Sequence, residues 1–310
     1  MNLEKRSRIW LGGNIFGYSC DEMTAADVMT TAATLGVNSV DTSSSYSNGL
    51  SEKIIGRWMS LNGKRENWII STKIGMKSGE NPSGLGKKEN IFQSAQRSQD
   101  NLQTDYLDVL FLHNPDPTTN EAETVDSLVE LFEGKVINSI GFSNIDETQL
   151  YRYVNLLRRN SIYEIPIYVQ NEFNWSTKKS SFWALLLEDY RDFKIFSVSY
   201  GVLQQGLLVQ TFENYRRLQI QDGMKRANKS IKIGNFLKNK KLEDCLKALD
   251  IELNAMGSDL FEFSMIFSLK YSNYSIWGVR NLEQLKKLDS EASVNLTDLE
   301  FSRLEKKYLI

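Results

Sequence analysis

Histidine and cysteine are scarce in this chain of 310 residues. It has one histidine, His113, and two cysteines, Cys20 and Cys245. A zinc site built from cysteine and histidine needs three or four such ligands, so we expect no metal centre of this kind. Two cysteines are also too few for a disulfide framework. A hydrolase triad is not expected either, because no G-x-S-x-G motif is present.

Neither sign of charge dominates, and no long apolar run occurs. The chain has 37 Lys and Arg against 39 Asp and Glu, a formal net charge of −2. Nucleic-acid binding normally requires a basic excess, so no nucleic-acid partner is expected. No run of about 18 apolar residues exists, so we expect no membrane span. The first residues, MNLEKRSRIWLGGN, are charged and do not resemble a secretory signal, which favours a cytoplasmic location.

Short, nearly continuous apolar runs recur along the chain and are typical of strands buried on both faces. They predict eight strands, at residues 8–12, 39–42, 68–73, 108–113, 137–142, 165–170, 194–200 and 274–278. Most of the segments between these predicted strands show the apolar periodicity of amphipathic helices. Thr24 is predicted to cap a helix that ends at Gly36, and further helices are predicted at residues 51–60, 121–132, 146–159 and 237–256.

Alternating strands and helices predict a parallel sheet. Eight such units in a chain of this length fit a single (β/α)8 TIM barrel over residues 1–310 better than two domains. A long loop precedes the last strand, at residues 206–236. Its basic residues are Arg216, Arg217, Lys225, Arg226, Lys229 and Lys232. This inserted loop is either a solvated loop or an anion-binding lid for cofactor or substrate, and long loops in compact domains are often functional.

Polar side chains stand at the ends of three adjacent predicted strands. Asp41 ends the second strand and Tyr46 follows in the next loop; Lys73 ends the third strand and His113 the fourth. In a TIM barrel these ends face the active site. Each residue alone has a structural explanation, such as a Lys73–Asp41 pair or a core histidine. Together they form an arrangement that is costly to keep for packing alone, because buried charges need partners.

These four residues and the segments around them resemble the aldo-keto reductase family, and the resemblance covers most of the chain. The matching segments are LGGNIFGY, VDTSSSYSNGLSEKIIGRWM, ISTKIG, YLDVLFLHNPDP, GKVINSIGFSN and VQNEFN. The resemblance implies that a nicotinamide delivers hydride to a carbonyl carbon while Tyr46 acts as general acid. Lys73 would lower the pKa of Tyr46, Asp41 would hold Lys73, and His113 would donate to the carbonyl oxygen.

The resemblance also implies where the cofactor binds. No G-x-G-x-x-G follows a strand, so a Rossmann fingerprint is absent. In this family the dinucleotide lies extended across the barrel mouth. Ser143, Asn144 and Gln170 would then bind the nicotinamide carboxamide, Tyr200 would stack on its ring, and Asn14 would be a further cofactor-binding residue.

Two segments depart from the family pattern. The chain has Tyr200, Gly201, Val202 and Leu203 where the family usually has Tyr-Ser-Pro-Leu. Gly201 and Leu203 would then contact the pyrophosphate without a serine hydroxyl. Near the C-terminus, Gly278, Arg280 and Gln284 match positions around the adenosine phosphate. The Arg280 guanidinium can grip a 2′-phosphate with paired hydrogen bonds, which favours NADP(H) over NAD(H).

The leading hypothesis is an NADPH-dependent oxidoreductase that reduces an aldehyde or ketone. Candidate substrates include sugar or nucleotide-sugar ketones, and Asn14, Phe16, Tyr18 and Trp175 predict a partly aromatic pocket. One alternative is a Schiff-base lyase or aldolase using Lys73, which Asp41 opposes by keeping the amine protonated. Another is a non-catalytic, cofactor-binding regulatory subunit, which the intact set of four residues does not favour. The sequence alone predicts no oligomeric state.

Overall fold

The computed structural model describes residues 8–63, 65–75, 84–159, 165–177, 194–211, 237–288 and 296–308. The chain divides into two compact units. The first consists of Met1–Asn171, Ser181–Tyr200 and Ser272–Asp289, and the second of Glu172–Ser180, Gly201–Tyr271 and Ser290–Ile310. The expectation of a single domain stays a prediction. The expected loop at 206–236 lies outside the described residues from position 212 onward, and its role as a lid stays a prediction as well.

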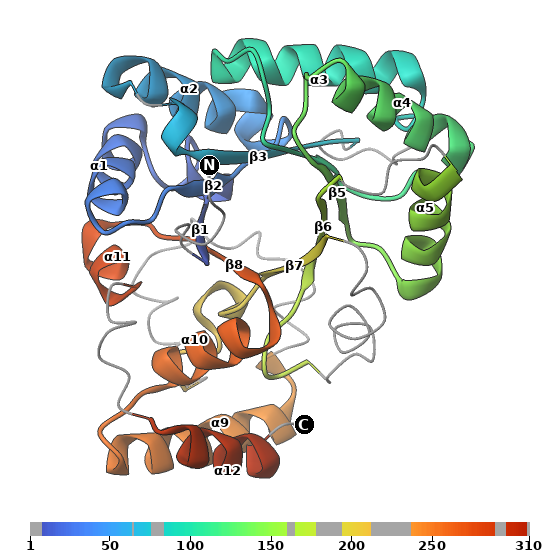
Figure 1. The fold of residues 1–310 in the computed structure, drawn as a ribbon. Coiled ribbons are helices and arrows are strands. Elements are labelled where there is room, and N and C mark those ends of the chain that lie inside the picture. Colours follow the sequence, from blue (N-terminus) through green and yellow to red (C-terminus); the bar gives the residue numbers. More distant parts are fainter. Residues whose placement is uncertain are drawn as a thin grey trace. The chain divides into compact units, whose positions relative to one another are not determined.

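Eight parallel strands close into a barrel in the order of the sequence, and β1 pairs with both β2 and β8 (Figure 1). The strands are β1 Ile9–Gly12, β2 Ser39–Asp41, β3 Ile69–Ile74, β4 Val109–Leu112, β5 Ile140–Ser143, β6 Ile167–Glu172, β7 Ile195–Tyr200 and β8 Tyr274–Trp277. Each overlaps one predicted strand. The predicted (β/α)8 barrel is therefore confirmed.

An aromatic layer fills the barrel interior toward the N-terminal ends of the strands. The Trp10 ring lies 5.8 Å from that of Tyr168 and 5.2 Å from that of Tyr274, and Phe196 packs against both tyrosines. These side chains occupy the interior, as in other closed barrels of this size. Polar residues therefore gather toward the opposite, C-terminal ends of the strands, where the candidate site lies.

Within the first unit, helices follow one another around the outside of the strands (Figure 1). They are α1 Glu22–Thr34, α2 Leu50–Asn62, α3 Lys88–Leu102, α4 Glu121–Glu133, α5 Glu147–Arg159 and α11 Leu282–Leu288. The predicted cap of α1 is wrong. Asp21 is the N-cap, and its carboxylate accepts the N–H of Thr24 at 2.8 Å, so Thr24 lies in the first turn. Gly36 ends this segment with φ +78°, as predicted.

The second unit contains α9 Lys240–Ala255, α10 Leu260–Tyr271 and α12 Asp298–Tyr308. The first of these was expected from residue 237. It begins later because Asn239 caps it, accepting the N–H of Leu242 at 3.1 Å. Trp175 is fully buried in this unit, with its indole N–H donating to Ser264 at 3.0 Å. Trp175 is therefore a core residue, and its predicted place in a pocket is wrong.

The same correction applies to Phe16, which is 1% exposed in the first unit. Phe16 follows a short turn after β1, and its burial makes it part of the protein interior rather than of a ligand pocket. Tyr18, by contrast, is 79% exposed. No helix within the described ranges is long and apolar enough to cross a membrane.

Gly56 allows α2 to pack closely on the end of α3. A Cβ at this position would lie 2.5 Å from the carbonyl oxygen of Asn101 and 2.7 to 2.8 Å from backbone atoms of Leu102. Backbone atoms cannot move aside as a flexible side chain can. We therefore expect Gly56→Ala to lower the free energy of unfolding by about 1–3 kcal/mol, the usual cost of overpacking.

Urea denaturation of the purified protein measures this cost. Lys53→Ala, on the exposed face of the same helix, is the matched control and should change stability by less than about 0.5 kcal/mol. Equal stability of the two variants would show that the contact between the helices is looser than described here.

Candidate active site

Lys73 lies at the C-terminal end of β3, with its ammonium group inside the barrel. Its side chain is only 1% exposed. The ammonium donates to the Asp41 carboxylate, to the carbonyl oxygen of Thr42 at 3.0 Å and to the hydroxyl oxygen of Tyr46 at 3.2 Å. An ammonium has three N–H donors, and all three are used here. The arrangement suits a charged lysine that is fixed in place.

The Asp41 carboxylate is held from two further directions. Its Oδ1 atom accepts from the Ser71 hydroxyl at 2.8 Å and from the Gln170 amide at 2.9 Å. Ser71 lies two residues before Lys73 on the same face of β3. Gln170 lies on β6, on the opposite side of the barrel from β2, and reaches Asp41 through the interior. The buried carboxylate is thus fully paired, as a buried charge requires.

A tight turn after β2 places Tyr46 above Lys73. The N–H of Tyr46 donates to the carbonyl oxygen of Ser43 at 3.0 Å. The next three residues, Ser47, Asn48 and Gly49, all have positive φ, at 49°, 54° and 83°. Two non-glycine residues in this region are strained, and such strain is held only where the surrounding structure enforces it. The turn thus brings the Tyr46 hydroxyl into contact with Lys73, and α2 begins directly after Gly49.

The pKa of Tyr46 departs from the expected direction. Burial raises it above the ordinary value for tyrosine; the Lys73 charge opposes the shift, and the Asp41 charge adds to it. Lys73 lowers this pKa as expected, but burial outweighs its charge, and the net direction in the protein alone is upward. Burial also acts to lower the pKa of Lys73, but attraction to Asp41 outweighs it and the net shift is upward. Tyr46 is therefore a protonated phenol and Lys73 an ammonium at neutral pH.

His113 directly follows β4, and its backbone N–H donates to the carbonyl oxygen of Ile74 at 2.8 Å. Its Nδ1 atom lies 3.2 Å from the Ser43 hydroxyl, and its ring meets that of Tyr46 edge-on with centroids 6.0 Å apart. Burial lowers the pKa of His113 to about 3, and the Lys73 charge adds to the shift. The imidazole is therefore neutral. The structure thus brings all four predicted catalytic residues together.

The residues predicted to bind a carboxamide also meet, at the ends of β5, β6 and β7. Ser143 and Gln170 are paired in register on neighbouring strands. The Asn144 amide donates to the carbonyl oxygen of His113 at 2.9 Å and to the Ser143 hydroxyl at 3.2 Å, and it accepts from the Tyr200 hydroxyl at 2.6 Å. The side-chain oxygen of Gln170, Oε1, has no hydrogen-bond partner among the described residues, whereas its backbone carbonyl oxygen accepts the N–H of Asn144 at 3.1 Å. This donor and acceptor set fits an amide ligand.

On the other side of the barrel mouth, Gly278 follows β8 and lies beside Asn14. A Cβ on Gly278 would be 3.8 Å from the Asn14 side-chain oxygen. The N–H of Arg280 donates to the Gln284 side chain at 2.9 Å, which fixes the start of α11. These contacts join Asn14 to Gly278 and Arg280 to Gln284. The role of this group in cofactor binding stays a prediction.

Gly201 and Leu203 belong to the second unit, so their predicted contact with a cofactor stays a prediction. Gly201 has φ +66°, and a Cβ there would lie 3.0 Å from the side chain of Glu172. This conformation explains why the chain has glycine where the family pattern has serine.

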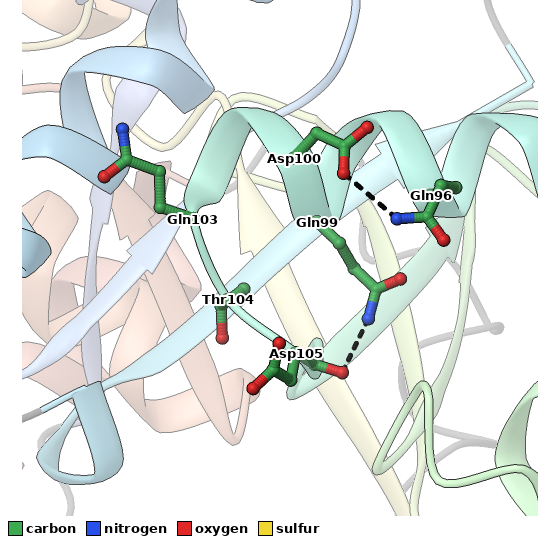
Figure 2. A pocket seen from close by; sticks show the side chains of 6 residues that line it. All are labelled: Gln96, Gln99, Asp100, Gln103, Thr104 and Asp105. Atoms are coloured by element: carbon green, nitrogen blue, oxygen red, sulfur yellow. Dashed lines mark hydrogen bonds between the residues drawn. The ribbon is translucent and has the colours of Figure 1, made fainter.

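A polar depression lies at the C-terminal end of α3 and in the turn that follows it, and none of the predicted site residues lines it (Figure 2). It is lined by Gln96, Gln99, Asp100, Gln103, Thr104 and Asp105. Gln96 donates to Asp100 at 3.0 Å, and Gln99 donates to the carbonyl oxygen of Asp105 at 2.6 Å. These groups partner one another, and no imidazole or thiol lies among them. We assign the depression no function.

Within the part of the chain described here, no three His, Cys, Asp or Glu residues are grouped to hold a metal ion.

Comparison with known proteins decides the family. The model of the aldo/keto reductase family matches residues 8–309, which is nearly the whole chain. The chain belongs to this family. Among curated aldo/keto reductase relatives, YhdN of Bacillus subtilis is 31% identical over 199 residues, covering 64% of this chain and 57% of that protein. An aryl-alcohol dehydrogenase of Pestalotiopsis microspora is 36% identical over 168 residues, covering 50% and 42%.

The alignments thus span about half the length of these curated aldo/keto reductase relatives. Among solved structures, a glycerol dehydrogenase from Gluconobacter oxydans superposes with a TM-score of 0.74 over 98% of this chain and 93% of that one. The sequence identity is 21%, so this likeness supports the fold alone.

Three groups of this aldo/keto reductase site escape prediction from the sequence. They are the Thr42 carbonyl, which accepts from Lys73, and the hydroxyls of Ser71 and Ser43. A signal for Ser71 exists, because residues two apart on a strand share a face. No comparable signal marks Ser43, which stands in a run of three serines.

Proposed function

We propose that this aldo/keto reductase is an NADPH-dependent oxidoreductase that reduces an aldehyde or ketone to the alcohol. The observation that carries the proposal is the contact between Lys73 and Tyr46. Lys73 donates to the Tyr46 oxygen at 3.2 Å, so the phenol proton of Tyr46 remains available to a second acceptor. A carbonyl oxygen that gains negative charge is such an acceptor.

Each of the four residues has one task in this reaction. Tyr46 gives its proton to the developing alkoxide, and Lys73 stabilises the phenolate left behind. Asp41 keeps Lys73 charged and oriented. His113, neutral and beside Tyr46, donates a hydrogen bond to the carbonyl oxygen and so shares its charge. A bound nicotinamide supplies the hydride.

The side chains at the barrel mouth support a nicotinamide dinucleotide as cofactor. The Ser143 hydroxyl would donate to a carboxamide and Gln170 Oε1 would accept from it, while Asn144 holds Ser143 and Tyr200 in place. Tyr200 stands beside Asn144 and would contact the nicotinamide ring. On the other side of the mouth, the group that contains Arg280 would hold the adenosine phosphate.

The name of one curated relative, an aryl-alcohol dehydrogenase, is consistent with this reaction class. For this chain we propose small aldehydes and ketones, including sugar or nucleotide-sugar ketones, as the substrate class.

The contacts of Lys73 do not favour a Schiff-base lyase. A Schiff base needs a neutral amine with its lone pair exposed. Lys73 instead uses all three N–H donors, and its pKa is raised. A purely regulatory, cofactor-binding role has no specific observation in its favour, because the four residues lie together and the Tyr46 phenol proton is available to a substrate.

Parallel fluorescence titration with NADPH and NADH tests the proposal, followed by a panel of aldehydes and ketones. We expect binding of NADPH at micromolar concentration or below, weaker binding of NADH, and oxidation of NADPH by at least one carbonyl compound. Binding of neither dinucleotide would overturn the proposal.

Replacement of Arg280 by alanine is expected to weaken NADPH more than NADH. A charge-assisted hydrogen bond to phosphate contributes about 1.5–3 kcal/mol, so the Kd for NADPH should rise roughly 10- to 100-fold. The Kd for NADH, which lacks the 2′-phosphate, should change little. Lys286→Ala removes the same charge from the exposed face of α11 and is the matched control. Equal weakening of both cofactors in Arg280→Ala would place recognition of the 2′-phosphate elsewhere.

A further inference from the structure

The single histidine must present a donor to the substrate oxygen if the proposed function holds. A neutral imidazole carries one N–H, on either Nδ1 or Nε2. His113 is neutral because burial and the Lys73 charge keep its pKa low. Its Nδ1 atom lies against the Ser43 hydroxyl, so Nε2 is the atom left to meet a ligand. The position of one proton on this ring therefore decides whether His113 offers a donor or a lone pair.

The Ser43 hydroxyl has three possible acceptors for its own proton. They are the carbonyl oxygen of Lys73 at 3.3 Å, the Ser45 hydroxyl at 2.9 Å and His113 Nδ1 at 3.2 Å. The Lys73 carbonyl already accepts from the N–H of Ser44 at 3.3 Å and from its hydroxyl at 3.0 Å, which fills both lone pairs. The Lys73 carbonyl oxygen is therefore already satisfied as an acceptor without a hydrogen bond from Ser43.

Ser45 can donate two hydrogen bonds to the Ser43 oxygen, one from its N–H and one from its hydroxyl. The N–H of Ser45 donates to the Ser43 oxygen at 3.2 Å, and the Ser45 hydroxyl, 2.9 Å away, can donate to the second lone pair. In that arrangement both lone pairs of Ser43 are filled, and His113 Nδ1 is the acceptor left for its only proton. Ser43 is fully buried, so water does not compete for this bond.

We infer that Ser43 is a positioning residue that holds His113 in the tautomer protonated on Nε2. His113 then turns an N–H toward the carbonyl oxygen. In the other tautomer a lone pair would face that oxygen and repel its growing negative charge. This inference rests on the proposed function for its consequence in turnover, but the tautomer is a property of the protein alone.

A chain with one histidine allows the tautomer to be read directly. Protein labelled with [15N]histidine gives one imidazole spin system, and long-range 1H–15N correlation distinguishes a protonated from an unprotonated ring nitrogen. We expect wild-type protein to be protonated on Nε2. In Ser43→Ala the two nitrogen signals should move toward each other as the second tautomer becomes populated. With a carbonyl substrate, kcat should fall roughly 3- to 30-fold, less than the loss of a whole oxyanion donor, and the Kd for NADPH should not change.

Ser47→Ala is the matched control, since the Ser47 hydroxyl donates to the carbonyl oxygen of Phe16 at 3.1 Å and touches neither Ser43, the Lys73 carbonyl nor His113. Its imidazole spectrum should match wild type. Wild-type protein protonated on Nδ1 would overturn the inference without any variant, and so would an unchanged spectrum in Ser43→Ala. The expected spectra in a protein that reduces no carbonyl compound would support the tautomer assignment and contradict the proposed function alone.

Discussion

Tyr46→Phe should lower kcat for carbonyl reduction by about 10²–10⁴-fold, because a positioned general acid contributes this much. The phenyl ring keeps the packing against His113, so the Kd for NADPH should stay within roughly twofold. Because the pKa of Tyr46 is raised, the wild-type rate should not decline with pH until at least the ordinary tyrosine value of about 10. Stopped-flow and steady-state kinetics over a pH series measure both effects.

Tyr151→Phe is the control for this experiment. Tyr151 is 58% exposed on α5 and takes part in none of the contacts of the candidate site described above, so loss of its hydroxyl should leave kcat unchanged. If Tyr46→Phe kept wild-type turnover, another group would be the proton donor and the roles of Lys73 and Asp41 would need reassignment.

Lys73→Met should lower the free energy of unfolding by about 3–5 kcal/mol, because it leaves the Asp41 carboxylate buried without its cation. Asp41 is 3% exposed, so water cannot replace the lost partner. Turnover should fall as well, since nothing then stabilises the phenolate of Tyr46. Chemical denaturation at neutral pH measures the stability change.

A double-mutant cycle separates the charge pair from side-chain packing. Lys73→Met combined with Asp41→Asn removes both charges, and the double variant should be more stable than Lys73→Met alone. A loss below about 1 kcal/mol in Lys73→Met would match an exposed ion pair and contradict a buried one.

The barrel and the contacts of Asp41, Tyr46, Lys73 and His113 follow from the sequence for a physical reason. Strands buried on both faces produce continuous apolar runs, and parallel strands in a closed barrel bring their C-terminal ends to one rim. Residues at the ends of three adjacent strands must then lie close together. Helix α3 was harder to predict, because its residues are mostly polar and only a narrow face, including Ile91 and Ala95, is buried.

Other features depend on three-dimensional distances that no sequence pattern encodes. Gln170 reaches Asp41 through the barrel interior, although the two residues are 129 positions apart. The upward pKa shift of Tyr46 results from burial, which the exposed-looking run of serines before it does not suggest. The proton arrangement around Ser43 likewise depends on which neighbours fill each lone pair.

The most direct test of the proposed chemistry is transfer of deuterium from NADPH labelled at C4. Wild-type protein should yield an alcohol with deuterium on the former carbonyl carbon, detected by mass spectrometry, and Tyr46→Phe should form the same product far more slowly. Alcohol without deuterium, or a borohydride-trapped adduct on Lys73 in place of the alcohol, would contradict hydride transfer by this site.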